Sequence, residues 1–292
     1  MPVTGSSILA MQEIDIIDET FDRDRTSTYE LSIQVSLNGF SYAVKDTIRN
    51  TFIALFNTGW QGFSIGSVDF RNFIGKLTEA KPWLKGEFKK VIVAFNLPYF
   101  TIVPNEFFEP SKSKLLLEQV HSIPDGFELG FTELPSLSLV IIFAAPHEFI
   151  NEWKSLHGGS LFTHSLLSFI QVPYSYTAKP FLQVDIDQQH LAIILHNNGQ
   201  LLAANSYLCK STTDVVYYTN ALARSVIDNT DNLQLNLTGD GELMAGLPEE
   251  ISKYFNSITH QANFHKPVFF SYRLLRYRAE YFRLFNLGVT CE

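Results

Sequence analysis

The stretch at residues 235–250, which reads LNLTGDGELMAGLPEE, carries the most information about the fold of this chain. An apolar run at 233–237 stops at the Thr-Gly-Asp-Gly of 238–241, and Pro248 opens a helical pattern after a second break at Gly246. This order predicts a buried strand, a glycine loop and the start of a helix. Because glycine has no Cβ, such a loop lets a ligand approach the backbone closely. The stretch therefore indicates a type of binding site, although it names no activity.

The composition is that of a folded, acidic protein. The chain has 292 residues, of which 46% are hydrophobic, enough for a large core in one or two domains. Its formal net charge is -8. Binding to nucleic acid through bulk charge needs clustered lysine and arginine, so we expect no nucleic-acid partner.

Membrane and export signals are missing from the pattern. The first residues, MPVTGSSILAMQEIDIIDE, turn acidic at once and have neither a basic region nor a long apolar region, unlike a signal peptide. The longest apolar stretch, 137–146, is roughly half as long as a membrane span and predicts a buried strand. Cys209 and Cys291 are too few for a disulfide framework or a zinc site. We therefore expect a cytoplasmic protein with no membrane span.

Motifs of catalysis and metal binding are also missing. The eight histidines show no His-x-x-x-His spacing, and the sequence holds no Gly-x-x-x-x-Gly-Lys-Ser/Thr loop. We expect no catalytic residue and no metal ligand from these patterns.

Both halves of the chain begin with three predicted strands. In the first half, residues 31–37 alternate apolar and polar side chains, and Asn38-Gly39, a strong hairpin signal, follows them. We expect strands from about 29 to 37, at 40–45 and at 51–56, a helix at 69–84 capped by Asp69, and a buried strand at 90–95. In the second half, we expect strands at 181–186, 189–195 and 201–208, a helix at 212–228 and a buried strand at 233–237.

The shared order predicts two like domains, each with a mixed sheet and helices on its faces, around a cleft. We expect an N-terminal arm at 1–28, a first domain at 29–175 with an inserted subdomain at about 127–172, and a second domain at 176–292 that ends in a helix. The other expected elements are strands at 100–103 and 268–270, two strands within 127–147, and helices at 107–120, 146–156, 248–259 and 274–285. Residues 160–172 fit a strand or a helix.

This duplicated order resembles the actin-like ATPase fold, in which two ribonuclease-H-like domains surround a nucleotide cleft. The stretch at 235–250 is similar to the adenosine-side loop of that superfamily. Bacterial members such as the type IV pilus assembly ATPase have a similar strand, Thr-Gly-Gly-Gly loop and Gly-Leu helix start. The segments VIVAFNLPYFTIVPNEFF and LFNLGVTCE also resemble a bacterial domain-of-unknown-function family whose members are assigned this fold. The matching positions of the loop are Thr238, Gly239, Asp240, Gly241, Gly246 and Leu247.

The resemblance implies a phosphate site from which this chain departs. Active members carry an Asp-x-Gly turn in each half, whose glycine lets the backbone wrap phosphate and whose acid organises magnesium. The turn at 35–39 has no aspartate, and the turn at 184–190 has Asp185 and Asp187 but no glycine. The resemblance therefore implies a degenerate site that has lost hydrolysis and needs no cofactor.

Two alternatives stay open at the tentative nucleotide cleft. Asp185 and Asp187 either hold Mg²⁺, a hard cation that prefers carboxylates, or face solvent at the end of a strand. The loop with Thr238, Gly239, Asp240 and Gly241 either contacts adenine or ribose, or only turns the chain from strand to helix.

The predicted C-terminal helix, 272–285, alternates arginine with tyrosine, phenylalanine and leucine. It either docks a partner, since arginine and tyrosine are favoured anchors, or closes the second domain with its arginines extended over the edge.

Three hypotheses follow. The first is a non-catalytic scaffold or regulatory module with a protein partner; the second is a weak ATP-binding protein or ATPase that uses Mg²⁺; the third is a binder of another small ligand in the same cleft. An open, polar cleft near Gly241 and Asp185 favours a ligand, whereas a cleft plugged by aromatic side chains favours the scaffold.

Overall fold

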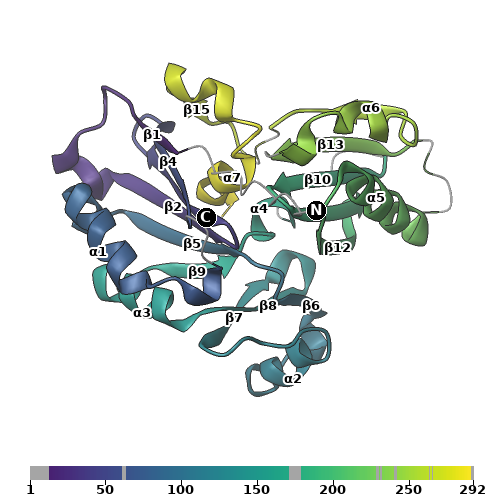
Figure 1. Cartoon of the computed structure of the whole chain (residues 1–292), viewed down its shortest axis with the longest axis horizontal. Coiled ribbons are helices and arrows are strands. Elements are labelled where there is room, and N and C mark those ends of the chain that lie inside the picture. The colour runs from purple at the N-terminus through teal and green to yellow at the C-terminus, as the bar shows by residue number, and fades with distance from the viewer. Residues whose placement is uncertain are drawn as a thin grey trace, which may run out of the picture.

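Two sheets of the computed structural model repeat one strand order, and they form the two halves of the molecule (Figure 1). The structure describes residues 13–60, 64–170, 179–227, 230, 232–239, 242–262, 264 and 266–290. The first sheet has the order β1-β4-β3-β2-β5-β9, with β15 added on β4, and the second has the order β12-β11-β10-β13-β14. In each, three antiparallel strands precede two parallel ones, so the two-domain α/β fold with ribonuclease-H-like halves is confirmed.

The first sheet is covered on both faces. Its strands are β1 (Ile14–Ile17), β2 (Tyr29–Ser36), β3 (Gly39–Asp46), β4 (Thr51–Gly59), β5 (Lys90–Asn96), β9 (Leu161–His164) and β15 (Phe269–Phe270). Helices α1 (Phe70–Ala80) and α3 (His147–Leu156) pack on one face, where Ile74 and Trp153 join the core formed with Ile33. Helix α7 (Phe282–Thr290) covers the other face, where Phe285 packs on Phe52.

The second sheet has helices on one face and the first half on the other. Its strands are β10 (Phe181–Asp187), β11 (His190–Asn197), β12 (Gln200–Leu208), β13 (Gln234–Gly239) and β14 (Ser257–Thr259). Helices α5 (Thr212–Val226) and α6 (Leu247–Ile251) pack against alternate residues of β10, among them Val184. Because side chains alternate along a strand, Asp185 and Asp187 point the other way, toward the first half.

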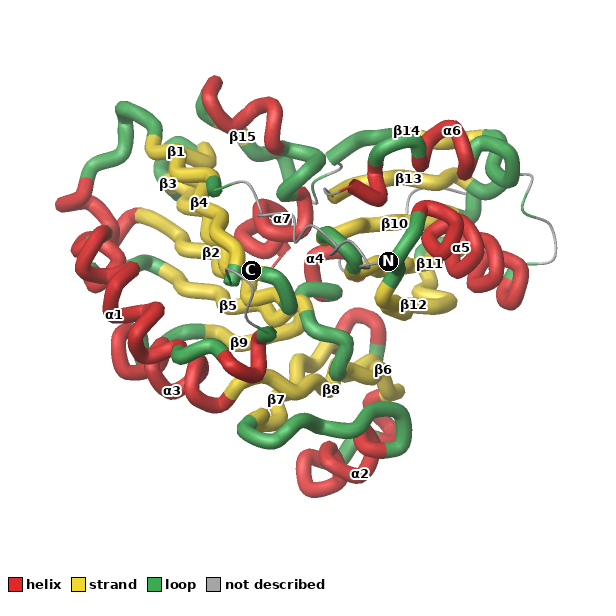
Figure 2. Tube along the Cα trace, in the orientation of Figure 1, coloured by secondary structure: helices red, strands yellow, loops and turns green. Residues whose placement is uncertain are grey.

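A small third sheet forms the inserted subdomain, at the bottom of Figures 1 and 2. Its strands run in the order β6 (Phe100–Pro104), β8 (Leu139–Pro146) and β7 (Phe127–Leu134), with α2 (Ser113–Glu118) beside them. The insertion thus begins before residue 127, where we expected it. The segment after β8 differs from our expectation too, because α3 packs on α1 and β9 pairs with β5. These two elements belong to the first half.

The segment expected to be an N-terminal arm contributes to the first sheet. Strand β1 pairs with β4, and Ile14 is buried in the same apolar cluster as Phe52 and Phe285. A 3₁₀ helix, Arg23–Thr28, then leads into β2. Residues 1–12 lie outside the described residues.

Several predicted helices are shorter than their patterns indicate. The first ends at Ala80, because Pro82 cannot continue it and opens a 3₁₀ turn. Only Ser113–Glu118 of the helix expected at 107–120 is α-helical. The prediction of a helix at 248–259 was wrong in its second part. The helix α6 ends at Ile251, and Ser257–Thr259 forms the fifth strand of the second sheet. Residues 160–172 hold both β9 and the short helix α4 (Leu167–Ile170), and 171–172 lie outside the described residues.

The C-terminal helix differs most in its placement. The predicted helix at 274–285 divides into a 3₁₀ helix, Tyr272–Tyr277, and α7. Helix α7 packs on α4 and across β2 and β3, rather than closing the second half. Its first turn therefore lies between the two halves.

Candidate functional site

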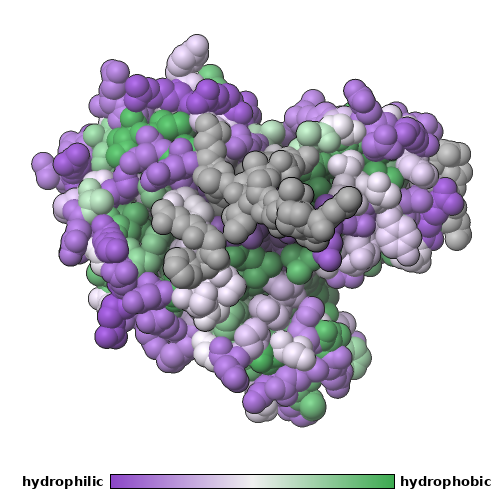
Figure 3. Space-filling view, viewed as in Figure 1, coloured by the Kyte–Doolittle hydropathy of each residue, from purple (hydrophilic) through white to green (hydrophobic). Residues whose placement is uncertain are grey.

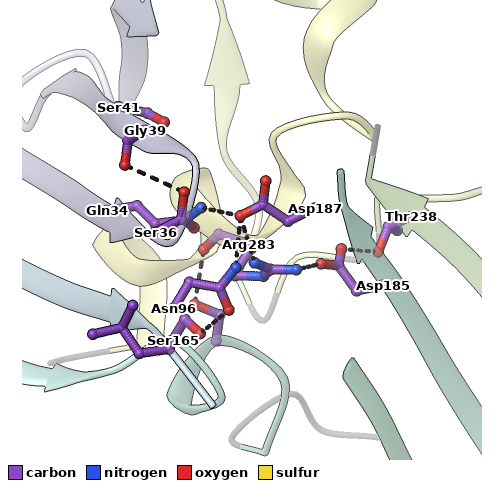
Figure 4. Close-up of polar contacts among 12 residues, drawn as sticks. Gln34, Ser36, Gly39, Ser41, Asn96, Ser165, Asp185, Asp187, Thr238 and Arg283 are labelled. Atoms are coloured by element: carbon purple, nitrogen blue, oxygen red, sulfur yellow. Dashed lines mark hydrogen bonds and ion pairs between the residues drawn. The ribbon is translucent and has the colours of Figure 1, made fainter. Parts of the chain in front are cut away.

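A buried polar cluster lies where the two halves meet (Figure 4). Asp185 and Asp187 come from β10, Arg283 from α7, Gln34 from β2 and Asn96 from β5. Each of these five residues is at most 9% exposed. Elements from both halves therefore converge on one site that is closed to solvent.

Arg283 occupies the centre of this cluster. Its Nη2 forms an ion pair with Oδ2 of Asp185, and its Nη1 lies 3.3 Å from Oδ2 of Asp187. The guanidinium also lies over the ring of Phe169, 5.8 Å from the ring centroid. Figure 4 shows the side chain of Arg283 reaching between the two aspartates. One guanidinium thus neutralises part of the charge of two buried carboxylates.

Burial shifts the titration of this group of charges. It lowers the pKa of Arg283 to about 9, because a guanidinium out of water is less stable in its charged form. It raises the pKa of Asp187 to about 6 for the same reason, while the hydrogen bond from Asn96 acts in the opposite direction. Arg283 therefore keeps its charge at pH 7, and Asp187 is harder to ionise than a carboxyl group in water.

The first half holds Asp187 through two amides. Asn96 Nδ2 donates to Oδ2 of Asp187 at 2.6 Å, and Gln34 Nε2 donates to the same oxygen at 3.2 Å. Ser165 Oγ donates in turn to Oδ1 of Asn96 at 2.8 Å, which fixes the orientation of that amide. Asp187 is therefore a bridge between the two sheets rather than a free ligand.

The second half holds Asp185 through Thr238. The two residues are register partners on the parallel strands β10 and β13, and Thr238 Oγ1 donates to Oδ1 of Asp185. Gln183 Nε2 donates to Oγ1 of Thr238 at 2.8 Å, and Asn236 Nδ2 donates to Oε1 of Gln183 at 2.9 Å. The structure thus brings three of the predicted site residues, Asp185, Asp187 and Thr238, into one hydrogen-bonded network.

Gly239, a fourth predicted residue, is explained by packing. Its φ is +102°, and a Cβ at this position would lie 1.8 Å from the carbonyl oxygen of Ile186. Its N–H donates to the carbonyl oxygen of Ala279 at 3.0 Å. The backbone N–H of Gly239 is therefore already hydrogen-bonded to the C-terminal segment. Asp240 and Gly241 lie outside the described residues.

The hairpin turn after Asp187 shows the cost of its missing glycine. Gln188 has a φ of +57°, in the left-handed region that glycine adopts at the lowest cost. In the corresponding turn of the first half, Ser36 Oγ donates to the carbonyl oxygen of Gly39, and Trp60 Nε1 donates to that of Ser36. Groups of this first turn are thus engaged within the first half itself.

Two buried histidines flank the cluster and are neutral at pH 7. His164 is saturated: its Nε2 bonds the carbonyl oxygen of Leu97, and the N–H of Leu166 donates to its Nδ1. Burial lowers its pKa to about 3 and that of His190 to about 4. Neither ring nitrogen of His190 finds a partner among the described residues. The described part of the chain contains no group of three or more His, Cys, Asp or Glu side chains arranged for a metal ion.

The structure corrects two sequence-based alternatives. Asp185 and Asp187 do not face solvent. Arg283 and Thr238 contact Asp185. Arg283, Asn96 and Gln34 contact Asp187. Arg283 is not extended over a surface edge, since only 4% of it is exposed. The cleft is plugged at this point, by an arginine in a polar network with Phe169 beside it.

Three residues of the buried cluster were not among the predicted site residues: Gln34, Asn96 and Arg283. Gln34 occupies a polar position of an alternating strand, which reads as a residue facing solvent, and Asn96 ends the apolar run KVIVAFN, where a polar residue is expected. Arg283 had no local signal that separates it from Arg273, Arg276 and Arg278.

The duplicated sheets and the acids between them define a protein of the actin-like ATPase fold. A solved structure from Bacteroides thetaiotaomicron, described as a protein with actin-like ATPase fold and unknown function, is similar over 94% of this chain and 100% of its own, with a TM-score of 0.77 and 21% identity. A PilM–PilN type IV pilus biogenesis complex includes a chain that is similar over 89% of this one and 97% of its own, with a TM-score of 0.55 and 15% identity.

The chain belongs to the family described as "Protein of unknown function (DUF3822)", whose model matches residues 18–258. This confirms the expected resemblance to a family of unknown function with this fold. No curated protein matches the sequence. Among the helices described, none has both the length and the apolar character needed to cross a membrane.

Proposed function

We propose that this protein is a non-catalytic scaffold or regulatory module of the cytoplasm, which binds a protein partner and whose nucleotide site is degenerate. The single observation that carries the proposal is the position of Arg283. Its guanidinium lies between Asp185 and Asp187, the two carboxylates best placed to organise a magnesium ion.

A magnesium ion would have to displace a buried cation to reach these acids. Breaking a buried ion pair is costly, because each charge is left without a partner and away from water. Asn96 and Gln34 also direct their amide N–H groups at Asp187, and such donors repel a metal ion. These contacts favour the resident arginine over a metal.

The C-terminal segment contacts Gly239 as well as the acids. The carbonyl oxygen of Ala279 accepts a hydrogen bond from the N–H of Gly239. Arg283, one helical turn further on, donates to the carboxylates of Asp185 and Asp187. A nucleotide bound between these two elements would compete with one continuous segment of the chain itself. This supports a site that has lost its ligand.

A protein partner is the remaining part of the proposal. A similar chain has been solved in a complex of two proteins, PilM and PilN. Shared architecture does not fix a function, so this likeness supports partner binding without naming a partner.

A weak ATP-binding protein or ATPase is the second candidate. It is favoured by one observation, the hydrogen bond between Asp185 and Thr238, which places an acid and a hydroxyl in register on adjacent strands beside the cleft.

Thermal unfolding with and without millimolar MgATP separates the two candidates. A ligand present at 100 times its Kd stabilises the folded state by about 2.7 kcal/mol, a readily measured rise in melting temperature. The scaffold proposal predicts no rise and no release of phosphate. A rise accompanied by phosphate release, absent from a heat-inactivated control, would establish the ATPase instead.

A further inference from the structure

A groove separates two strands that each end a sheet. Strand β6 ends the sheet of the inserted subdomain, and β12 ends the sheet of the second half. Residues 100–102 of β6 and 201–205 of β12 line a hollow of about 370 Å³ between them. Figure 3 shows hydrophobic surface in the hollow between the lower and the right-hand lobes.

The walls of the groove mix apolar and polar residues. Phe100, Ile102, Leu139, Leu201 and Leu202 are among its apolar residues, and Thr101, His121 and Asn205 are polar. No lysine, arginine, aspartate or glutamate occurs among the described residues that line the groove, although the whole chain carries a net charge of -8. A charged segment would lose its hydration here without gaining a partner of opposite charge, so the groove suits an uncharged occupant.

Strand β12 lacks the usual protection of a sheet edge. Natural edge strands prevent unwanted pairing with charged side chains, prolines or short length. β12 has nine residues, QLLAANSYL, and none of them is charged or a proline. Within the described residues β12 pairs with β11 alone, so its other edge has no ladder partner there, and Leu202 and Leu208 on this strand are exposed.

We infer that this groove binds an extended, uncharged peptide segment of a partner protein, added as a further strand on the edge of β12. Addition of a strand gains affinity from main-chain hydrogen bonds and specificity from alternate side chains in pockets. The wall contains residues 201–205 of β12, so a partner strand of five residues, about 17 Å long when extended, would pair along this whole part of β12. This inference rests on the proposed function, since it names the surface and the class of partner.

A single extended segment fits the groove better than a second copy of the chain. In a copy, β12 is packed against α5 and lies beside its own inserted subdomain, so a second chain brings more bulk to the hollow than one extended segment does. One strand with alternating apolar side chains enters from the open side without these elements.

The probe for the test is a displayed library of random linear dodecapeptides, selected on the folded full-length chain. An enriched peptide is then synthesised and titrated by fluorescence anisotropy. Leu202→Asp places a charge in the wall, and Leu208→Asp places the same charge on the same strand outside the groove. Both leucines are surface-exposed, at 38% and 59%, so both variants are expected to fold.

We expect enriched peptides with alternating apolar residues and no charge at the central positions. Leu202→Asp should weaken their binding roughly tenfold or more, because a carboxylate would be buried against an apolar side chain, and Leu208→Asp should change it less than about twofold. Amide exchange should slow in 100–102 and 201–205 when peptide binds. The inference is overturned if the peptides bind both variants equally, if amide exchange slows elsewhere, or if no peptide is enriched over an unrelated acidic protein. It is also overturned if no peptide binds and the chain instead forms a dimer that Leu202→Asp abolishes.

The inference and the proposed function fail in different ways. Failure of the peptide selection would not contradict the proposal of a closed nucleotide site, because that proposal is tested separately with MgATP. Hydrolysis of ATP together with peptide binding at β12 would refute the non-catalytic proposal and keep the groove.

Discussion

Arg283 of α7 pairs with Asp185 of β10, which lies 98 residues earlier in the chain. The pair joins the last helix to the first strand of the second half, and it is buried on both sides, with side-chain exposures of 4% and 2%. Through Asp187 the same guanidinium is linked to Asn96 and Gln34 of the first half. One arginine therefore ties together both sheets and the C-terminal helix.

The first prediction concerns the stability that this pair provides. Arg283→Met keeps much of the side-chain volume but leaves two buried carboxylates without a cation. We expect a loss of about 3–5 kcal/mol in the free energy of unfolding, the usual cost of removing one partner of a buried pair, measured by urea denaturation.

Arg276→Met is the matched control, because Arg276 lies in the same segment and contacts the ring of Tyr277, 4.6 Å from its centroid, instead of an aspartate of the cluster. We expect it to cost less than about 1 kcal/mol. Equal losses in the two variants would show that Arg283 acts through general packing.

A second prediction follows for metal ions. In Arg283→Ala, the space and charge of the guanidinium are removed, and Asp185 and Asp187 become two adjacent carboxylates that attract a hard cation. We expect millimolar Mg²⁺ or Ca²⁺ to raise the melting temperature of this variant and EDTA to reverse the rise. The wild-type chain should respond no more than the Arg276→Met control; a wild-type response as large as that of Arg283→Ala would mean that the arginine does not exclude the metal.

The third prediction separates the two roles of glycine at positive φ. Gly239 and Gly246 have φ of +102° and +75°, but a Cβ at Gly246 meets nothing within 4 Å, whereas one at Gly239 meets the backbone of Ile186 at 1.8 Å. Gly246→Ala should cost about 1–2 kcal/mol, from strain alone. Gly239→Ala should cost clearly more, because β10 and β13 must separate.

Equal urea midpoints for the two alanine variants would contradict the close approach of β13 to β10. The same geometry shows that a bulky substitution at Gly239 tests folding rather than ligand binding.

The fourth prediction is a loss of stability in acid. Burial lowers the pKa of His190 from about 6.5 to about 4, so the unfolded chain binds a proton in this window that the folded chain does not. The stability that the neutral His190 ring contributes is therefore fully present above about pH 6.5 and is lost as the pH drops toward 4. Between pH 7 and pH 5, we expect His190 to account for a loss of about 1.5–2 kcal/mol.

His190→Gln should reduce this loss, measured as the difference between unfolding free energies at the two pH values. Asp187 acts in the opposite direction, because its raised pKa lets the folded state take up a proton below about pH 6 and so stabilises the folded state there. An unchanged pH dependence in the variant would show that His190 is not buried as a neutral ring.

Local patterns predicted the two sheets well, for physical reasons. Asn38-Gly39 and the alternation in β2 specify a hairpin and its buried face without long-range information. The helix at α5 is similarly defined by its capping box of Ser211 and Asp214. Such elements depend on neighbours within a few residues.

The candidate site was only half predictable. We expected Asp185, Asp187 and Thr238 at one cleft, but the pairing of Asp185 with Thr238 depends on the register of β10 and β13. The pairing with Arg283 depends on where α7 packs, and its amphipathic pattern fits either sheet equally well. The same limit explains β1 and β15, two short strands whose pairing with β4 is set by the surrounding core rather than by their own sequences.

The most direct test of the closed site is a calorimetric titration of the full-length wild-type chain with MgATP, followed to millimolar concentration beside Arg283→Met and Arg276→Met. Our proposal predicts no saturable heat for the wild-type chain or for Arg276→Met, because Arg283 holds both carboxylates in each. Saturable binding of one MgATP by the wild-type chain, with phosphate released in the same sample, would contradict it.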